Sequence, residues 1–256
     1  MKVVILCGGL GSRLSEETQT RPKPMVEIGG QPILWHIMKT YATYGFNEFV
    51  IAVGYKADVI KEYFLNFYYM RNNFSIHLHN GDVSVSKGAH EDWTVHVVDT
   101  GLETQTGGRI KRVKQWLGDE TFLLTYGDAV GNINIRDLVA FHKKNRKLAT
   151  VTAVRPPARF GALQFHGDLV TKFDEKPQTG EGWINGGFFV LEPQVLEYIS
   201  GDDSIFEREP LERLAEDQQL VAFQHPDFWQ CMDTLRDLRL LDRYWQSGQA
   251  AWKVWE

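Results

Sequence analysis

The feature that most limits how this chain can fold is a glycine-rich turn placed directly after a short apolar run. Residues 2–6 contain Val3, Val4, Ile5 and Leu6 in succession, which predicts a buried strand of a parallel sheet covered on both faces. The turn then reads Gly8-Gly9-Leu10-Gly11-Ser12-Arg13. Glycine lets the backbone turn tightly and approach a ligand, and successive N–H groups in such a turn form an anion site. The segment therefore predicts a phosphate-binding loop.

Two common phosphate loops do not match this turn. A P-loop needs Gly-Lys followed by Ser or Thr, and the dinucleotide fingerprint needs a glycine where this chain has Leu14. Two cations nevertheless support an anion site. Arg13 ends the turn with a planar guanidinium suited to phosphate, and Lys23 lies between two prolines that stiffen its backbone. The glycines alone would also be consistent with a tight turn that binds nothing.

The remainder of the chain alternates predicted strands and helices, which is typical of βαβ units and a parallel sheet. Apolar spacing predicts helices over 33–41, 56–70, 110–117, 135–144, 195–199, 210–218 and 235–245. Apolar runs predict strands over 49–53, 74–79, 93–98, 122–126, 149–154, 162–165, 169–173, 183–191 and 221–223, with a loop or hairpin over 80–92. We expect one domain over 1–256, of α/β class: a Rossmann-like three-layer α/β/α fold with a mixed, mainly parallel central sheet and a small β-rich insertion.

Two further segments are predicted to lie near the glycine turn. Thr106-Gly107-Gly108-Arg109 opens a predicted helix, and a helix N-terminus with free N–H groups favours an anion or a polar base. Asp128 follows the predicted strand over 122–126. Open parallel sheets bind ligands beyond the carboxyl ends of their strands, so we expect Asp128 and the glycine turn to meet at one sheet edge.

Composition excludes several classes of function. The net charge of -5 over 256 residues argues against a nucleic-acid-binding protein, which is usually basic. Two cysteines, Cys7 and Cys231, cannot form a disulfide framework, so we expect a reducing, cytoplasmic setting. No stretch approaches the ~20 apolar residues of a membrane helix, so no membrane association is expected. His36, His142 and His225 show no metal-ligand spacing.

Taken in order, the motifs of this chain resemble those of the sugar nucleotidyltransferases, and most closely the branch that uses CTP and glucose 1-phosphate. The resemblance spans the whole chain. It rests on the glycine turn, Pro22-Lys23-Pro24-Met25, Pro32-Ile33-Leu34-Trp35-His36, Thr106-Gly107-Gly108-Arg109, Tyr126-Gly127-Asp128, Asn185-Gly186-Gly187-Phe188-Phe189 and Met232-Asp233-Thr234.

The resemblance implies that a sugar phosphate attacks the α-phosphate of a nucleoside triphosphate in line, giving CDP-glucose and pyrophosphate for dideoxyhexose or O-antigen type polysaccharide synthesis. The attacking oxygen is already anionic, so catalysis requires positioning and charge neutralisation rather than a general base. Arg13 and Lys23 are the implied catalytic cations, and Asp128 and Asp233 the implied ligands of Mg²⁺, an ion that prefers oxygen ligands. The implied substrate contacts are Leu6, Gly8, Gly9, Gly11, Ser12, Arg13, Lys23, Thr106, Gly107, Arg109, Tyr126, Asp128, Glu175, Lys176, Asn185 and Gly186.

Several interpretations stay open at this point. Instead of binding a metal, Asp128 would also be typical of a turn at the end of a strand, and Asp233 of the N-cap region of the last helix, beside Thr234. A sister enzyme using UTP or dTTP would share these motifs. A catalytically silent nucleotide-sugar sensor would be expected to lack Lys23 or one of the two aspartates. A glycosyltransferase would normally carry an Asp-x-Asp motif, which the sequence lacks.

Two positions depart from the family pattern. Cys7 replaces a small residue, and Ala129 replaces a glycine, which narrows the backbone conformations available next to Asp128.

The C-terminal tail contains two aromatic residues that suggest self-association. We expect Trp252 and Trp255 to be exposed, and, together with the family resemblance, they predict a homo-oligomer.

Overall fold

The computed structural model describes residues 1–86, 88, 91–156, 162–166, 169–174 and 182–256. Its strands are β1 (Val3–Cys7), β2 (Glu27–Ile28), β3 (Gln31–Pro32), β4 (Glu48–Val53), β5 (Phe74–His77), β6 (Asp82–Val85), β7 (Thr94–Asp99), β8 (Phe122–Tyr126), β9 (Ala129–Gly131), β10 (Ala149–Val154), β11 (Ala162–His166), β12 (Leu169–Asp174), β13 (Ile184–Leu191), β14 (Leu220–His225) and β15 (Trp229–Cys231). Its α-helices are α1 (Ser15–Thr18), α2 (Ile33–Thr43), α3 (Ala57–Met70), α4 (Thr106–Arg112), α5 (Lys114–Leu117), α6 (Ile135–Asn145), α7 (Glu209–Glu216) and α8 (Leu235–Gln246), with 3-10 turns η1 (Ser12–Leu14), η2 (Lys23–Met25) and η3 (Pro193–Tyr198).

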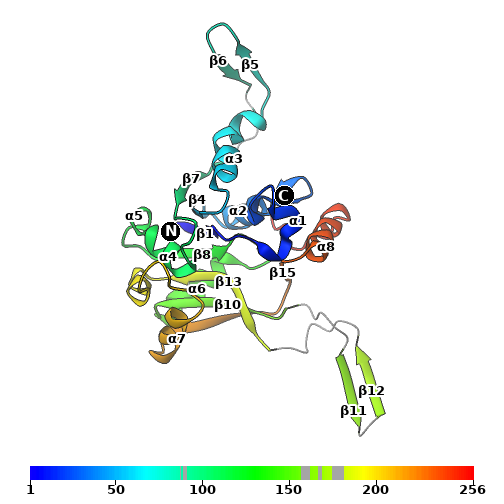
Figure 1. Cartoon of the computed structure of the whole chain (residues 1–256). Coiled ribbons are helices and arrows are strands. Elements are labelled where there is room, and N and C mark those ends of the chain that lie inside the picture. Colours follow the sequence, from blue (N-terminus) through cyan, green and yellow to red (C-terminus); the bar gives the residue numbers. More distant parts are fainter. Residues whose placement is uncertain (87, 89–90, 157–161, 167–168, 175–181) are drawn as a thin grey trace.

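A seven-stranded sheet in the order β14-β10-β13-β8-β1-β4-β7 runs through the centre of the molecule (Figure 1). The pairs β1–β4, β1–β8, β4–β7 and β10–β14 are parallel, whereas β13 is antiparallel to both of its neighbours. The expected mixed, mainly parallel sheet is therefore confirmed. The parallel strands β1 and β8 end side by side, at the glycine turn and at Gly127.

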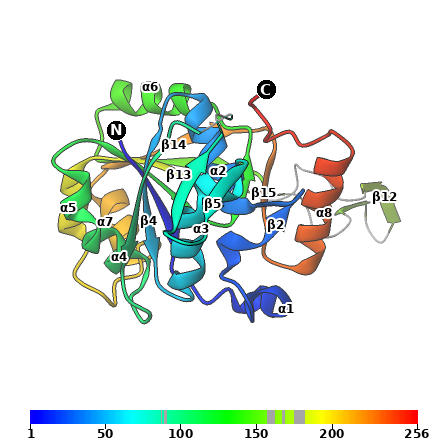
Figure 2. The ribbon, with the colours of Figure 1, turned by 90° about the horizontal axis from the view of Figure 1, so that it is seen from above.

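Successive residues of the central strands face two different cores, which is the period of two that a strand imposes. Val3 and Ile5 of β1 lie in a core with residues of α2, α6 and α8, while Val4 and Leu6 lie in a core with residues of α4, α5 and α7. Figure 2 shows α4, α5 and α7 on one side of the strands and α2 and α8 on the other. The continuous apolar run of β1 thus results from helices that cover both faces of the sheet, and the three-layer expectation is confirmed.

Two strand pairs project from the body in Figure 1. One is the antiparallel pair β5–β6, in which β6 lies within the segment expected to be a loop or hairpin, so the hairpin alternative is confirmed. The other, β11–β12, matches the predicted hairpin and the expected β-rich insertion. The helix predicted over 195–199 is instead part of the 3-10 turn η3, which Pro193 begins.

The tail tryptophans were expected to be exposed, but in the structure they are buried or partly buried. Trp252 is fully buried and stacks near Phe228 and Trp245, and Trp255 is partly buried against Trp35. The large exposed apolar side chains lie elsewhere, mainly on α3 and on β5–β6, at Leu65, Met70, Phe74, Ile76 and Leu78. The tail therefore completes the core instead of offering an aromatic surface.

Candidate active site

A cavity of about 350 Å³ opens where β1 and β8 end and α4 begins. Most of the residues predicted to bind substrate line it: Leu6, Gly8, Gly9, Gly11, Ser12, Arg13, Lys23, Thr106, Arg109, Tyr126 and Asp128. Thr104 and Gln105, which precede the predicted Thr-Gly-Gly-Arg motif, also line the cavity. The predicted meeting of the glycine turn and Asp128 at one sheet edge is confirmed.

The glycines of the turn have three different structural roles. Gly11 adopts a left-handed conformation with φ 64°, which glycine permits. A Cβ on Gly8 would lie 2.1 Å from Nη1 of Arg109, whereas a Cβ on Gly9 would meet nothing within 4 Å. Gly8 is therefore required by a protein contact, while Gly9 faces open space in which a ligand could approach the backbone.

Arg109 clamps the ends of three neighbouring strands. Its terminal nitrogens donate to the carbonyl oxygens of Gly8 at 3.0 Å, Val53 at 3.3 Å and Gly101 at 2.7 Å, which follow or end β1, β4 and β7. The side chain is 5% exposed, and this burial lowers the pKa of Arg109 from its usual value. Arg109 lines the cavity, but both of its terminal nitrogens bond to the protein itself.

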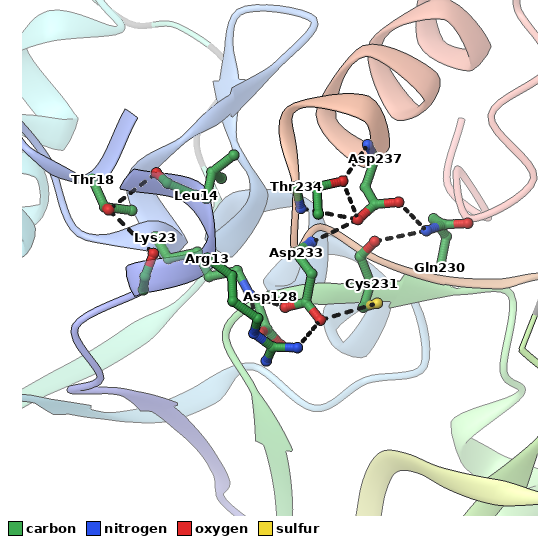
Figure 3. Close-up of polar contacts among 11 residues, drawn as sticks. Arg13, Leu14, Thr18, Lys23, Asp128, Gln230, Cys231, Asp233, Thr234 and Asp237 are labelled. Atoms are coloured by element: carbon green, nitrogen blue, oxygen red, sulfur yellow. Dashed lines mark hydrogen bonds and ion pairs between the residues drawn. The ribbon is translucent and has the colours of Figure 1, made fainter. Parts of the chain in front are cut away.

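Lys23, Asp128 and Asp233 form a compact charged cluster (Figure 3). The Lys23 ammonium donates to Asp128 Oδ2 at 2.6 Å and to Asp233 Oδ1 at 2.5 Å, and Arg13 donates to Asp233 Oδ2 at 2.6 Å. Lys23 is 8% exposed and Asp233 7%. Burial acts to lower the pKa of Lys23, but the two carboxylates outweigh burial and raise the pKa above its usual value. The four predicted catalytic and metal-binding residues therefore meet in one place.

Short segments that sequence reasoning did not predict bring the two aspartates together. β9 follows Asp128 and pairs with β15, so that Cys231 lies opposite Ala129, and the Met232 N–H donates to the Asp128 carbonyl at 2.8 Å. Asp233 then precedes α8, which Thr234 and Asp237 begin with a capping box. Ala129 sits in the extended backbone of β9, which any residue can adopt, so the departure from glycine causes no backbone strain there.

The N–H groups of the two glycines in the first turn of α4 are not free, contrary to expectation. The helix begins at Thr106, so the glycines lie inside it. The N–H groups of Gly107 and Gly108 donate to the Ser204 carbonyl at 2.9 and 3.3 Å, and a Cβ on Gly107 would lie 2.7 Å from that oxygen. The expected anion site at these two glycines is therefore wrong, because a neighbouring loop already satisfies their donors.

Two further predicted substrate residues, Asn185 and Gly186, are not among the residues that line the cavity. Asn185 is exposed, and its Nδ2 donates to the Tyr126 hydroxyl at 3.3 Å. Gly186 is buried, with its carbonyl accepting from Trp229 Nε1 at 2.8 Å. Glu175 and Lys176 lie outside the described residues.

Sequence reasoning also missed Glu207. This carboxylate accepts hydrogen bonds from Tyr126 and Thr106 in the cavity wall. It belongs to no motif that carried the resemblance, and no local pattern links it to residues so far away in the chain.

The two cysteines show no sign of reactivity. Cys7 and Cys231 are both free thiols. Burial, reinforced by Asp128, raises the pKa of Cys7 well above its usual range, and burial with Asp233 raises the pKa of Cys231 to about 12. Both thiols therefore stay protonated near neutral pH.

The described part of the chain contains no group of three or more His, Cys, Asp or Glu side chains placed to hold a metal ion. A cation at this site would therefore take two carboxylates from the protein and the rest of its ligands from substrate and water. That is the usual arrangement for Mg²⁺. None of the helices in the described ranges combines the length and apolarity needed to cross a membrane.

Comparison with known proteins agrees with this geometry. A family model described as nucleotidyl transferase matches residues 2–246. Glucose-1-phosphate cytidylyltransferase of Salmonella typhimurium is 51% identical over 257 residues, covering 100% of both chains. A Bacillus subtilis relative named probable glucose-1-phosphate cytidylyltransferase is 46% identical over 256 residues, again with 100% coverage of both.

Solved structures at lower identity support the fold alone. The inositol-1-phosphate CTP transferase from T. maritima has a TM-score of 0.66 at 15% identity, covering 94% of this chain and 95% of that one. UDP-glucose pyrophosphorylase from Acinetobacter baumanii has a TM-score of 0.69 at 15% identity, covering 95% and 92%. The full-length similarity to curated relatives and the match to the family model agree with the sheet-edge cavity: the chain belongs to the nucleotidyl transferase family.

Proposed function

We propose that this chain transfers CMP from CTP to α-D-glucose 1-phosphate, forming CDP-glucose and pyrophosphate. The observation that carries this proposal is the identity of 46–51% to cytidylyltransferases over the full length of each. The cavity agrees with it, because Lys23, Arg13 and the glycine turn place cations and backbone beside two carboxylates. There are two alternatives, a sister reaction with UTP or dTTP and a catalytically silent sensor of nucleotide sugars. The experiment below distinguishes both of them from the proposed reaction.

The proposed mechanism relies on charge and position. The phosphate oxygen of glucose 1-phosphate attacks the α-phosphorus of CTP, the bond to the β-phosphate oxygen breaks, and pyrophosphate leaves with that electron pair. Lys23 and Arg13 neutralise the triphosphate and the charge that develops on pyrophosphate. In this structure their partners are Asp128 and Asp233, so phosphate oxygens would share or replace carboxylate oxygens as acceptors.

A divalent cation, for which we propose Mg²⁺, would be held by Asp128 and Asp233. Members of this family generally use a divalent metal, and the two carboxylates fit one because both already contact a single cationic group, the Lys23 ammonium. When bound, the ion would supply additional positive charge to the phosphates.

Substrate recognition is proposed for residues around the cavity. The nucleotide would be contacted by Leu6 near the end of β1 and, through the backbone of the turn, by Gly8, Gly9, Gly11 and Ser12. Thr106, Gly107 and Arg109 would shape the side of the cavity at α4, and Tyr126, Asn185 and Gly186 the side toward the sugar. Glu175 and Lys176 are proposed for the sugar phosphate on the resemblance alone.

Pyrophosphate release from purified protein with Mg²⁺ and glucose 1-phosphate tests the proposal, with CTP, UTP, dTTP, ATP and GTP compared. We expect release with CTP far above the others. Release mainly with UTP or dTTP would show that the protein catalyses the sister reaction with that nucleotide instead. No release with any nucleotide or sugar phosphate would favour the sensor.

The broader setting of the enzyme is also a proposal. We propose that residues 1–256 act as one nucleotidyltransferase domain, because strands from β1 to β14 share one sheet and α8 packs on its core. A homo-oligomer is supported by the exposed apolar side chains of α3 and β5–β6. The two free thiols favour the cytoplasm, and CDP-glucose would supply O-antigen type polysaccharide synthesis.

A further inference from the structure

A carboxylate outside every predicted motif holds two hydroxyl groups of the cavity wall. The Tyr126 hydroxyl donates to Glu207 Oε1 at 2.6 Å, and the Thr106 hydroxyl donates to Glu207 Oε2 at 2.6 Å. Tyr126 ends β8 and Thr106 begins α4, and both line the cavity. Glu207 lies just before α7 and is itself half-buried. One side chain therefore ties together two walls of the site that are distant in the sequence.

The neighbouring hydrogen bonds determine the direction of these two bonds. The Phe206 N–H donates to the Thr106 hydroxyl oxygen at 2.9 Å, and Asn185 Nδ2 donates to the Tyr126 hydroxyl oxygen at 3.3 Å. The Gly187 N–H donates to Asn185 Oδ1 at 2.8 Å, which orients that amide. Because an ionised carboxylate only accepts, both hydroxyl protons must point at Glu207. Each hydroxyl can then offer only a lone pair to the cavity.

Among the described residues, Glu207 has no cationic partner for its charge. Within the described ranges, no lysine, arginine or histidine forms an ion pair with this carboxylate; its bonds are to the two hydroxyls. Burying part of an unpaired carboxylate is unfavourable for stability. The hydrogen bonds that this carboxylate makes in the described structure therefore go only to two groups that line the cavity, which links Glu207 to the site.

We propose that Glu207 is a positioning residue of the active site, which presents the hydroxyl oxygens of Tyr126 and Thr106 to the substrates as hydrogen-bond acceptors. This inference rests on the proposed function. The complementary substrate chemistry is a hydrogen-bond donor. The exocyclic amino group of cytosine and the hydroxyl groups of the sugar phosphate are the two donors that the proposed substrates carry.

The substitution Glu207→Gln tests the inference, because it keeps the shape of the side chain and removes its second acceptor. The amide N–H₂ must then face one hydroxyl, which turns its own proton into the cavity and opposes a substrate donor. We expect KM for one substrate to rise about tenfold or more, with kcat changed less and the melting temperature near that of the wild type. A rise in KM for CTP, with weaker preference over UTP, would identify the amino group; a rise for glucose 1-phosphate would identify a sugar hydroxyl.

Glu192→Gln is the matched control. Glu192 is also half-buried and accepts from a hydroxyl, Thr121 at 2.9 Å, and from His142 at 3.0 Å, but it lies at the opposite end of β8 and outside the cavity. Its KM values should equal those of the wild type. In the Tyr126→Phe background one hydroxyl is already absent, so adding Glu207→Gln should raise KM less than it does in the wild type.

The outcomes separate this inference from the proposed function. A wild-type protein without turnover would overturn the proposed function, and the role of Glu207 would fall with it. An active wild type with unchanged KM values in Glu207→Gln would overturn this inference alone. If Glu207→Gln does not fold, Tyr126→Phe and Thr106→Val take its place, since unchanged KM values in both of these folded variants would equally contradict the inference.

Discussion

Replacing Asp233 by asparagine should separate the stability of the charged cluster from its chemistry. The substitution Asp233→Asn keeps the shape of the side chain but removes its charge, while Lys23 retains Asp128 at 2.6 Å. The buried ammonium therefore stays paired and the fold should survive. The capping box of α8 is also untouched, because Thr234 and Asp237 form it.

The expected magnitudes differ for folding and for turnover. A hydrogen bond to a charged group contributes about 1.5–3 kcal/mol, which applies to the bond from Lys23 to the nearly buried Asp233. The pair with Arg13 adds little, because the Arg13 side chain is 71% exposed. We therefore expect a loss of about 1.5–3 kcal/mol in unfolding free energy, or roughly 3–12 °C in Tm. Turnover should fall by about 10²–10³, as when one preorganised charge contact is removed.

Three measurements check this prediction: a thermal melt, pyrophosphate release as a function of Mg²⁺ concentration, and Mn²⁺ binding by electron paramagnetic resonance in the presence of nucleotide. Asp242→Asn is the control, since Asp242 accepts from the Gly29 N–H at 2.9 Å and has no contact with the cluster. The control should retain full turnover. Turnover of Asp233→Asn within twofold of the wild type, with normal Mn²⁺ binding and a native melt, would refute the assignment of this carboxylate.

Two further predictions concern the glycine turn and a buried histidine. Gly8→Ala should lower the unfolding free energy by about 1–3 kcal/mol, because its Cβ would collide with the Arg109 guanidinium. Gly9→Ala should instead have the melting temperature of the wild type and a higher KM for the nucleotide. Equal melting temperatures for the two variants would contradict this prediction. His36 is fully buried, and that burial lowers its pKa to about 4. In the unfolded chain His36 has its usual pKa of about 6.5 and binds a proton below that pH, whereas in the folded state it does so only near pH 4. The unfolding free energy should therefore be greatest above pH 6.5 and fall by about 3 kcal/mol as the pH drops toward 4. Urea unfolding at several pH values measures this loss, and His36→Leu should remove most of the slope; an unchanged slope would show that other groups cause the loss.

The sequence alone determined the layered sheet and one half of the site. The apolar run of β1, the glycine turn and the strand that leads to Asp128 are local patterns, and neighbouring parallel strands necessarily bring their carboxyl ends to one edge. Motifs in order along the chain also pointed to the family. These features could be predicted because periodicity and turn chemistry are set by residues close to each other in the chain.

Tertiary structure alone decided the rest. β9 and β15 have three residues each, too few to show a period, yet their pairing places Asp233 against Asp128 and Lys23. Glu207 reaches Thr106 and Tyr126, and Ser204 occupies the donors at the start of α4, across long stretches of chain. Trp252 is buried because aromatic rings from other segments surround it. Such contacts join side chains and single carbonyl groups that have no local signature, so they exist only once the chain has folded.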